Sequence, residues 1–455
     1  MTQTKKIGIN DRNDQTIVDF LKQYSKDENP IEVNFRNLVP ELKSPDRYTH
    51  LIHTYPAKLL AHIPYFFLNN TFFSKNDDYV LDPFCGSGTV LLETLLSGRN
   101  AYGADANPLA RLIAQVKVTK LIPHDLKNNC NEIVAEAKLL NGVDVPNIGN
   151  RDFWFPKRTT KILARLLYAI KKIEDEQIRN FMLVSFSNCI KKVSYADQAI
   201  SVPVKLNPSR YKEFDKKRDK TIKRLSELEE MDVIGKFSSI TSLNIERFTE
   251  FGKVAIAKNS ANIVSTDARK LSKEINGSSL LEDNSVSLII TSPPYAGAQK
   301  YIRASSLNLG WTDLAKPEEL VSLDSKIIGR ENFRKSEITI SKTGIEPADI
   351  MIERIYKLNP VRATIVCNYL FEMKEALNEM IRVLKKNGFL VLVVGNNRVC
   401  GEEFNTQEYL CDFLLNKGLN LQFKLIDNIK SYGLMTKRNK TADIISREWI
   451  LVFKK

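Results

Sequence analysis

Two short stretches of the sequence bring together residue types that bind a small ligand and activate an amine. The first, DPFCGSGT at 82–89, joins an apolar run to a helical pattern. Its glycines let the backbone approach a ligand closely, and the N-terminus of the following helix offers unpaired N–H groups. The second, TSPPY at 291–295, follows another apolar run and ends in an aromatic ring. Either turn alone would be ordinary structure, but together they indicate a functional site.

Three acidic residues at predicted strand ends suggest the ligand. The glycine-rich turn lacks the lysine of a phosphate-binding loop, and Leu91 stands where a dinucleotide-binding turn has its third glycine. Asp105, at the end of the next predicted strand, can accept hydrogen bonds from ribose hydroxyls. Asp82 can meet an ammonium group, and Asp267, after a later strand, can accept from an adenine amino group. A nucleoside with an amino-acid tail suits all three acids, and that ligand is S-adenosylmethionine.

The two turns and their surroundings resemble the motifs of amino-group DNA methyltransferases, the cytosine-N4 and adenine-N6 enzymes. The resemblance rests on DPFCGSGT, on Asp105 within GADANPLA, and on TSPPY. The segment HTYPAK at 53–58 resembles the family's motif that packs over the methionine end of the cofactor. The resemblance covers 50–120 and 260–455. It implies a site-specific DNA methyltransferase that uses S-adenosylmethionine and flips its target base out of the duplex.

The motif residues supply a predicted site. The cofactor-binding residues are expected to be Tyr55, Pro56, Lys58, Asp82, Pro83, Phe84, Gly86, Ser87, Gly88, Thr89, Asp105, Ala106, Asp267 and Ala268. The catalytic residues are expected to be Ser292, Pro293, Pro294 and Tyr295. No metal is expected, because the six cysteines and four histidines show no metal-ligand spacing.

The second stretch suits the chemistry of a weak nucleophile. The lone pair of an exocyclic amine is delocalised into the base, so the amine must be activated by its neighbours. The Ser292 hydroxyl and the Pro293 carbonyl can accept its two N–H bonds, and Tyr295 offers a face for the flipped base. Transfer is then a direct in-line displacement in which positioning supplies most of the rate. Cytosine-C5 methylation is disfavoured, because the chain has no Pro-Cys pair to present a nucleophile.

The residue before the two prolines bears on the target base. In the family that the motifs resemble, Ser at this position goes mostly with cytosine-N4 and Asp or Asn mostly with adenine-N6. Ser292 therefore favours cytosine-N4. Adenine-N6 methylation is the alternative, and an RNA base N-methyltransferase or a catalytically silent DNA-binding protein is less favoured.

Alternating strand and helix patterns in two blocks must position these residues. The first block, 78–120, shows two strands each followed by a helix, and the second, from 261, ends in two antiparallel strands. We predict an α/β, doubly wound, seven-stranded Rossmann-like methyltransferase sheet with a terminal β-hairpin and a mainly helical insertion. The predicted divisions are an N-terminal extension (1–49), the first part of the catalytic domain (50–120), a helical basic insertion and candidate target-recognition region (121–255), and the second part of the catalytic domain (256–455).

The charge favours a polyanionic partner. The chain has 67 Lys and Arg against 54 Asp and Glu, a net charge of +13, and 151–240 alone holds 20 against 12. Such a surface would neutralise phosphates, so double-stranded DNA is the expected partner. The expected DNA contacts are Lys205, Arg210, Tyr301 and Arg303. Trp311 is assigned to DNA or to the core with equal weight, and a second basic cluster lies at 437–440.

The remaining expectations concern the cellular setting. No run approaches the ~18 apolar residues of a membrane span, and the N-terminus is polar, without a signal peptide. A cytoplasmic protein without a membrane partner is expected. A cognate restriction endonuclease or the components of another defence system are the further expected partners.

Overall fold

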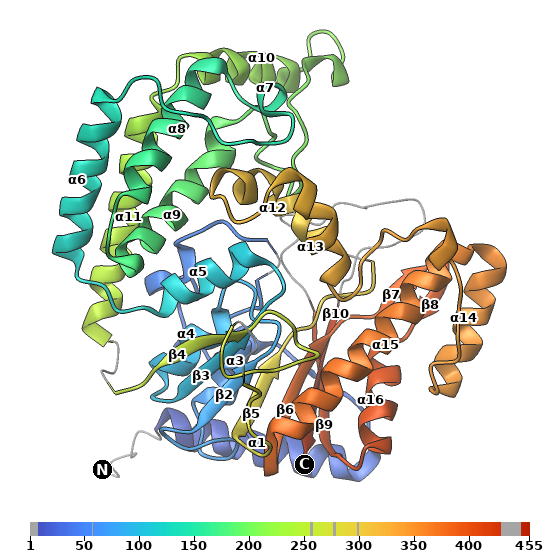
Figure 1. The fold of residues 1–455 in the computed structure, drawn as a ribbon. Helices are drawn as coiled ribbons and strands as arrows, with labels where there is room; N and C mark the ends of the chain where they lie inside the picture. Colours follow the sequence, from blue (N-terminus) through green and yellow to red (C-terminus); the bar gives the residue numbers. More distant parts are fainter. Residues whose placement is uncertain (1–7, 57, 255–257, 276–278, 298–299, 429–446) are drawn as a thin grey trace.

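A computed structural model describes residues 8–56, 58–254, 258–275, 279–297, 300–428 and 447–455 (Figure 1). The basic cluster at 437–440 therefore lies outside the described residues, as does position 57 within the HTYPAK segment. No helix in the described part of the chain is long and apolar enough to cross a membrane.

One mixed sheet of eight strands forms the centre of the structure, in the order β1-β9-β10-β6-β5-β2-β3-β4. Its strands are β1 (Ile31–Val33), β2 (Tyr79–Asp82), β3 (Asn100–Ala104), β4 (Ala261–Ser265), β5 (Val286–Thr291), β6 (Leu384–Val394), β9 (Asn420–Asn428) and β10 (Arg447–Lys454). All neighbouring strands are parallel except β10, which runs antiparallel to both β6 and β9. The predicted antiparallel closing pair is therefore confirmed.

The prediction of seven strands was wrong by one. The extra strand, β1, comes from the N-terminal extension and pairs in parallel with β9. It has three residues, of which only Ile31 is buried, so it shows no alternation that a sequence pattern could reveal. Helix α1 (Ile9–Asp27) packs on the same edge of the sheet through Phe20, whose ring lies 5.8 Å from that of Phe423 on β9.

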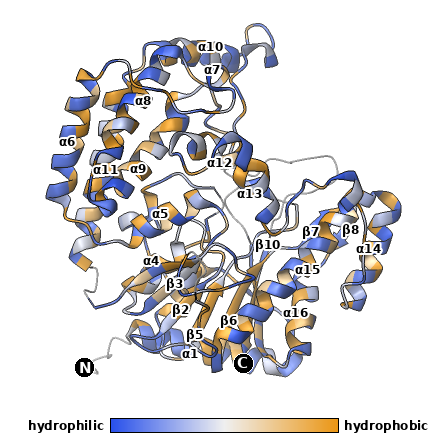
Figure 2. Cartoon of the chain, in the orientation of Figure 1, coloured by the Kyte–Doolittle hydropathy of each residue, from blue (hydrophilic) through white to orange (hydrophobic). Residues whose placement is uncertain are grey.

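Two helical layers cover the sheet because its central strands are apolar on both faces. On β5, Ile289 packs towards one core with α14 (Glu346–Leu358), α15 (Pro360–Val383) and α16 (Thr406–Asn416). Its neighbours Leu288 and Ile290 pack towards the other core with α1 and α3 (His62–Leu68). Helices α4 (Thr89–Leu96) and α5 (Pro108–Val118) lie beside β3 and β4. The central strands β5 and β6 are accordingly largely orange, that is hydrophobic, in Figure 2.

A group of helices between α5 and β4 forms a separate apolar core above the sheet (Figure 1). It contains α6 (Pro123–Leu139), α7 (Arg151–Trp154), α8 (Lys157–Lys171), α9 (Glu176–Ile190), α10 (Lys216–Glu229) and α11 (Val233–Val254). Helix α12 (Tyr301–Trp311) joins this core through Trp311, which is 0% exposed and lies against Phe155 and Phe186. Trp311 is a core residue, so its alternative assignment to a DNA contact was wrong.

The remaining elements are short. They are α2 (Phe35–Leu38), α13 (Leu320–Lys326), the five 3-10 turns η1 (Tyr48–Leu51), η2 (Lys191–Val193), η3 (Pro208–Arg210), η4 (Pro317–Glu319) and η5 (Lys335–Glu337), and the two-stranded sheet β7 (Asn397–Val399) and β8 (Glu402–Phe404). Helix α13 and the chain after it return to the ends of the central strands and complete the wall of the site described next.

Candidate active site

A pocket of about 630 Å³ lies at the carboxyl ends of β2, β3, β4 and β5, where ligands sit in open α/β sheets. Its walls are Tyr55, Pro83, Phe84, Gly86, Asp105, Ala106, Asp267, Ala268, Ser292, Pro294, Tyr301, Lys326, Ile327 and Ile328. The structure thus brings residues from both predicted turns and from the two later acids into one cavity. The wall at 326–328 was not predicted, because the end of α13 and the residues after it carry no motif.

The glycine-rich turn has the backbone conformation that its sequence indicates. Gly86 and Gly88 have φ angles of 48° and 77°, in the left-handed region that favours glycine. A Cβ atom on Gly88 would stand 3.0 Å from both Cα and Cβ of Ala114, so only glycine lets α5 pack this closely. The Gly86 N–H points to the next strand end and donates to Asp105 Oδ2 at 2.9 Å.

Asp105 is held by backbone N–H groups rather than by a cation. Its second oxygen, Oδ1, accepts from the Asn107 N–H at 2.8 Å, while Arg111 donates to the carbonyl oxygens of residues 105 and 106. Burial raises the pKa of Asp105, and the two N–H donors partly oppose that effect. Each carboxylate oxygen has a further lone pair, so Asp105 can still accept from a ligand in the pocket.

Asp82 links the two turns. Its Oδ1 accepts from the Thr291 hydroxyl at 2.6 Å and from the Phe84 N–H at 3.1 Å, which fixes the end of β5 directly before Ser292. Among the described residues no hydrogen bond reaches Oδ2. The side chain is 4% exposed, and burial raises its pKa to about 7. Asp82 lies just behind the pocket wall formed by Pro83.

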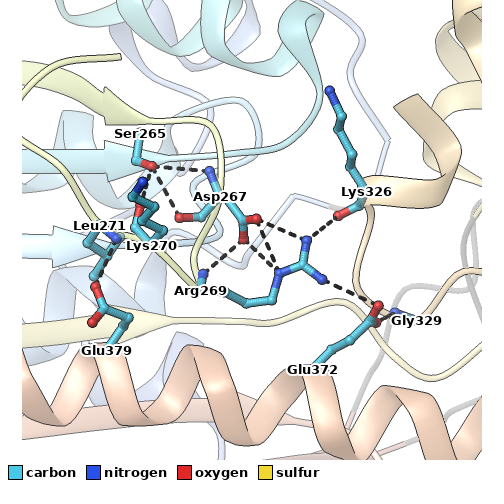
Figure 3. Close-up of polar contacts among 9 residues, drawn as sticks. All are labelled: Ser265, Asp267, Arg269, Lys270, Leu271, Lys326, Gly329, Glu372 and Glu379. Atoms are coloured by element: carbon cyan, nitrogen blue, oxygen red, sulfur yellow. Dashed lines mark hydrogen bonds and ion pairs between the residues drawn. The ribbon is translucent and has the colours of Figure 1, made fainter. Parts of the chain in front are cut away.

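Asp267 is already paired in this structure. Arg269 donates to its Oδ1 from the backbone N and Nε, both at 2.9 Å, and to its Oδ2 from NH2 at 3.0 Å (Figure 3). The same guanidinium donates to the Lys326 carbonyl at 3.1 Å and lies 3.4 Å from Glu372 Oε1 on α15. Glu372 Oε2 accepts from the Gly329 N–H at 3.2 Å. Arg269 therefore connects Asp267 with the 326–329 loop, a contact that sequence reasoning missed.

The TSPPY turn is only partly open to the pocket. Ser292 and Pro294 line the pocket, whereas Pro293 is buried. The Tyr295 hydroxyl donates to Glu448 Oε1 on β10 at 3.3 Å, and burial raises the pKa values of both groups. Glu448 belongs to the last strand, more than 150 residues from the motif. Glu448 therefore fixes the ring of Tyr295. No local sequence pattern could have predicted this contact.

The predicted residues near the methionine end are divided between several places. Tyr55 lines the pocket, and its hydroxyl accepts from Asn107 Nδ2 at 3.1 Å. Pro56 lines a neighbouring cavity, and Lys58 turns away to donate to the His50 carbonyl at 2.9 Å. In the glycine-rich turn, Ser87 Oγ is buried without a hydrogen-bond partner among the described residues, and Thr89 begins α4.

The predicted DNA contacts lie apart from one another. Lys205 Nζ stands 4.3 Å from the ring centroid of Phe153, in the loop after α9, and Arg210 is exposed in η3. Arg303 is exposed on α12, where it lines a broad groove with α13. Tyr301, on the same helix, lines the strand-end pocket instead of the outer surface.

Residues 7–115 match the family model described as DNA methylase, N6/N4 type. With the strand-end pocket and its two turns, this match defines the class of protein: the chain is a DNA methyltransferase, and over residues 7–115 it is similar to the N6/N4 DNA methylase family. The type II methyltransferase M.MvaI of Kocuria varians is 25% identical over 418 residues, 86% of this chain and 85% of the relative. M.MjaII of Methanocaldococcus jannaschii is 32% identical over 111 residues, 24% of this chain and 20% of the relative.

More distant likenesses extend the comparison. The type II methyltransferase M.AvaI of Nostoc sp. is 23% identical over 392 residues, which cover 77% of this chain and 75% of the relative. The solved structure of the rRNA methyltransferase aviRa from Streptomyces viridochromogenes aligns with 92% of this chain and 96% of its own, at 11% identity and a TM-score of 0.30.

Proposed function

We propose that this chain is a site-specific DNA methyltransferase that uses S-adenosylmethionine to methylate the N4 amine of cytosine in double-stranded DNA. The observation that carries the proposal is the single pocket in which Ser292 and Pro294 of the second turn share walls with Gly86 and Asp105 of the first. An enzyme that transfers a group from a nucleoside cofactor to an amine needs both binding sites within one cavity.

The residues of the pocket suit S-adenosylmethionine. Asp82 Oδ2 and Ser87 Oγ are hydrogen-bonding atoms without partners among the described residues, at the side of the pocket assigned to the methionine end. Asp105 has lone pairs left for ribose hydroxyls, and Ala106, Asp267 and Ala268 form the wall assigned to the adenine. When bound, the cofactor supplies an electrophilic methyl group on a sulfonium.

The remaining residues of the proposed cofactor site either contact the cofactor or hold the backbone around it in shape. They are Pro56, Lys58, Pro83, Phe84, Gly88 and Thr89. Lys58 takes the second of these roles, because its ammonium is occupied by the His50 carbonyl.

The second turn holds the amine in our proposal. The Ser292 hydroxyl and the Pro293 carbonyl accept the two amine protons, which directs the nitrogen lone pair at the methyl group. Thr291 keeps this turn in register with the cofactor turn through its bond to Asp82. Tyr295, fixed by Glu448, is the stacking surface for the flipped base. The proton leaves after the displacement, so no general base is required.

The identity of Ser292 supports cytosine-N4 as the target, with adenine-N6 as the second candidate. The relatives named above are type II methyltransferases, which supports a duplex DNA substrate and a role beside a cognate restriction endonuclease. Lys205, Arg210 and Arg303 are proposed to contact the DNA backbone, and Tyr301 to contact the flipped nucleotide at the pocket.

Mass spectrometry of nucleosides from duplex DNA treated with the purified protein and cofactor tests the proposal. We expect N4-methylcytosine. N6-methyladenine without methylated cytosine would refute the base assignment, and methylation of RNA alone would refute the substrate. Ser292→Ala should lower turnover far more than cofactor affinity, whereas Ser285→Ala, directly before β5 and outside the pocket, should change neither.

A further inference from the structure

A second cavity adjoins the cofactor pocket and shares Tyr55 with it. It spans about 1030 Å³, including space open to solvent, between the segment that follows η1, the end of α9 and helix α12. Its charged residues are Lys191 and Lys192, and none of its lining residues is acidic. The cavity is therefore positively charged, and apart from Tyr55 and Pro56 none of its lining residues has a role assigned above.

The two lysines lack the partners that buried cations need. Lys191 Nζ donates to the Ile200 carbonyl, and Lys192 Nζ lies 3.4 Å from Asn188 Oδ1. Within the described residues neither ammonium has a carboxylate at ion-pair distance. Burial lowers the pKa of both groups, although Asp197 acts on Lys191 from farther away in the opposite sense. Two partly buried cations without a counter-charge are costly, and an anion bound in the cavity would offset that cost.

His53 adds an unused hydrogen-bonding atom to the same cavity. It is 5% exposed, and its Nε2 lies 3.1 Å from Ser187 Oγ. Asn308 already donates to that Oγ at 2.9 Å, so the serine hydroxyl can donate to Nε2 and leave the ring proton on Nδ1. Nδ1 is buried and has no partner among the described residues. A neutral imidazole with a free N–H suits an anionic oxygen.

The position of the cavity indicates which anion it takes. Gln198 and Ser201, on its wall, belong to the loop that carries Lys205, and Ala304 follows the exposed Arg303 on α12. The cavity is thus lined by segments that also carry proposed DNA contacts, and it shares Tyr55 with the pocket that is proposed to receive the flipped base. We propose that Lys191, Lys192 and His53 form a binding site for a backbone phosphate of the target DNA strand, beside the flipped nucleotide. This inference rests on the proposed function.

Substitution on both molecules tests the site. The recognition sequence is first mapped by sequencing methylated DNA from a host that expresses the protein. The probes are duplexes of that sequence, and in each of them one phosphate near the target base is replaced by a neutral methylphosphonate. One replacement should weaken binding by the unchanged protein and have no effect on the Lys191→Gln/Lys192→Gln variant. The salt dependence of that variant, plotted as log affinity against log salt, should also be shallower by about 0.9 for the lost phosphate contact.

The control is another pair of adjacent lysines after a helix of the same group. Lys171 and Lys172, at the end of α8, pair with Asp313 and Glu136. Lys171→Gln/Lys172→Gln removes the same charge but should respond to every methylphosphonate as the unchanged protein does. Thermal unfolding of the Lys191/Lys192 variant should be no lower than that of the unchanged protein, because two uncompensated cations are removed.

Three results would overturn the site. The two double variants could show the same response to every methylphosphonate. The Lys191/Lys192 variant could lose affinity for S-adenosylmethionine in the absence of DNA while its DNA binding stays intact, which would assign the cavity to the cofactor's carboxylate. Failure of the unchanged protein to bind any duplex would overturn the proposed function together with this site, and that result is visible before any variant is compared.

Discussion

Asp105 and Asp267 stand at the ends of neighbouring strands, β3 and β4, and line the same pocket, yet they are stabilised in opposite ways. Asp105 accepts from two backbone N–H groups and has no ion-pair partner among the described residues. Asp267 is held by the guanidinium of Arg269, which is itself anchored to the 326–329 loop. The difference separates a carboxylate that is prepared for a ligand from one that is largely satisfied by the protein.

The same contrast extends to Asp82, which ends β2, the strand next to β3 and Asp105. Like Asp105, Asp82 has no ion-pair partner among the described residues. Burial raises the pKa values of both groups, because hydrogen bonds from N–H and hydroxyl groups offset only part of the desolvation. A cationic or hydroxyl-bearing ligand would complete their surroundings. On the β4 side, loss of Arg269 would instead leave Asp267 and a loop carbonyl without their donor. We therefore expect substitutions on the two sides to differ in size and in pH dependence.

The largest effect is expected at Asp105. Asp105→Ala removes the acceptor for the Gly86 and Asn107 N–H groups and for the ribose, and should cost ~1–3 kcal/mol of cofactor binding. Isothermal titration calorimetry on the folded variant measures the loss. Asp19→Asn, on α1 and remote from the pocket, is the control. Unchanged affinity in the Asp105 variant would remove the ribose assignment and with it the contrast between the two acids.

A smaller, pH-dependent effect is expected at Asp82. Its pKa of about 7 in the folded protein lies above the ordinary value of 3.8, so the buried carboxyl stabilises the ligand-free fold most fully below pH 3.8 and loses that contribution as the pH rises through about 7. A cationic ammonium requires the ionised form. Cofactor affinity should therefore fall about tenfold between pH 8 and pH 6, as the ionised fraction falls.

Asp82→Asn tests that assignment. The variant should bind the cofactor more weakly at pH 8 and show a flatter pH profile, because residue 82 no longer titrates. Its thermal unfolding should also lose less stability than that of the unchanged protein between pH 5 and pH 8. A profile as steep as that of the unchanged protein would mean that another group, such as Asp105, controls the titration.

The contrast also explains what could be predicted from the sequence. The donors to Asp105 are Gly86 and Asn107, which lie within the motifs themselves. The surroundings of Asp105 could therefore be predicted from the motifs. Of the groups that anchor Arg269, Lys326 ends the short helix α13, which carries no motif, and Glu372 lies on a helix about a hundred residues further along the chain than Arg269. Contacts of that kind depend on tertiary packing, and no local pattern reports them.

The fold shows the same limit. The apolar strands β5, β6 and β10 were predictable because each combines burial with β-branched residues, and β6 and β10 also contain aromatic residues. Strand β1 has three residues and was missed, since its pairing with β9 depends on where α1 places the chain. Trp311 follows the TSPPY turn in sequence but packs against the group of helices between α5 and β4. The composition near the turn does not reveal this contact.

The smallest effect is expected at Arg269, and it distinguishes the two sides of the pocket most sharply. Arg269→Gln removes the ion pair with Asp267 and the bond to the Lys326 carbonyl, so the wall at 326–328 loses its anchor. The pair is partly exposed, so we expect a loss of cofactor affinity of only a few-fold, about 1 kcal/mol or less. Unlike the effect at Asp82, it should be constant between pH 6 and pH 8, because the Arg269 guanidinium stays charged over that range.

Arg382 provides the matched control for Arg269. It also forms a network with α15 and with the chain after β4, through Glu379 and Asp283, and Glu379 accepts from the Leu271 N–H at 3.0 Å. None of these residues lines the pocket. Arg382→Gln should therefore lower the unfolding temperature without changing cofactor affinity, whereas Arg269→Gln should lower both. If the two variants lost affinity equally, the effect would come from general loosening of the chain after β4. Asp267 would then need no arginine to form its side of the pocket.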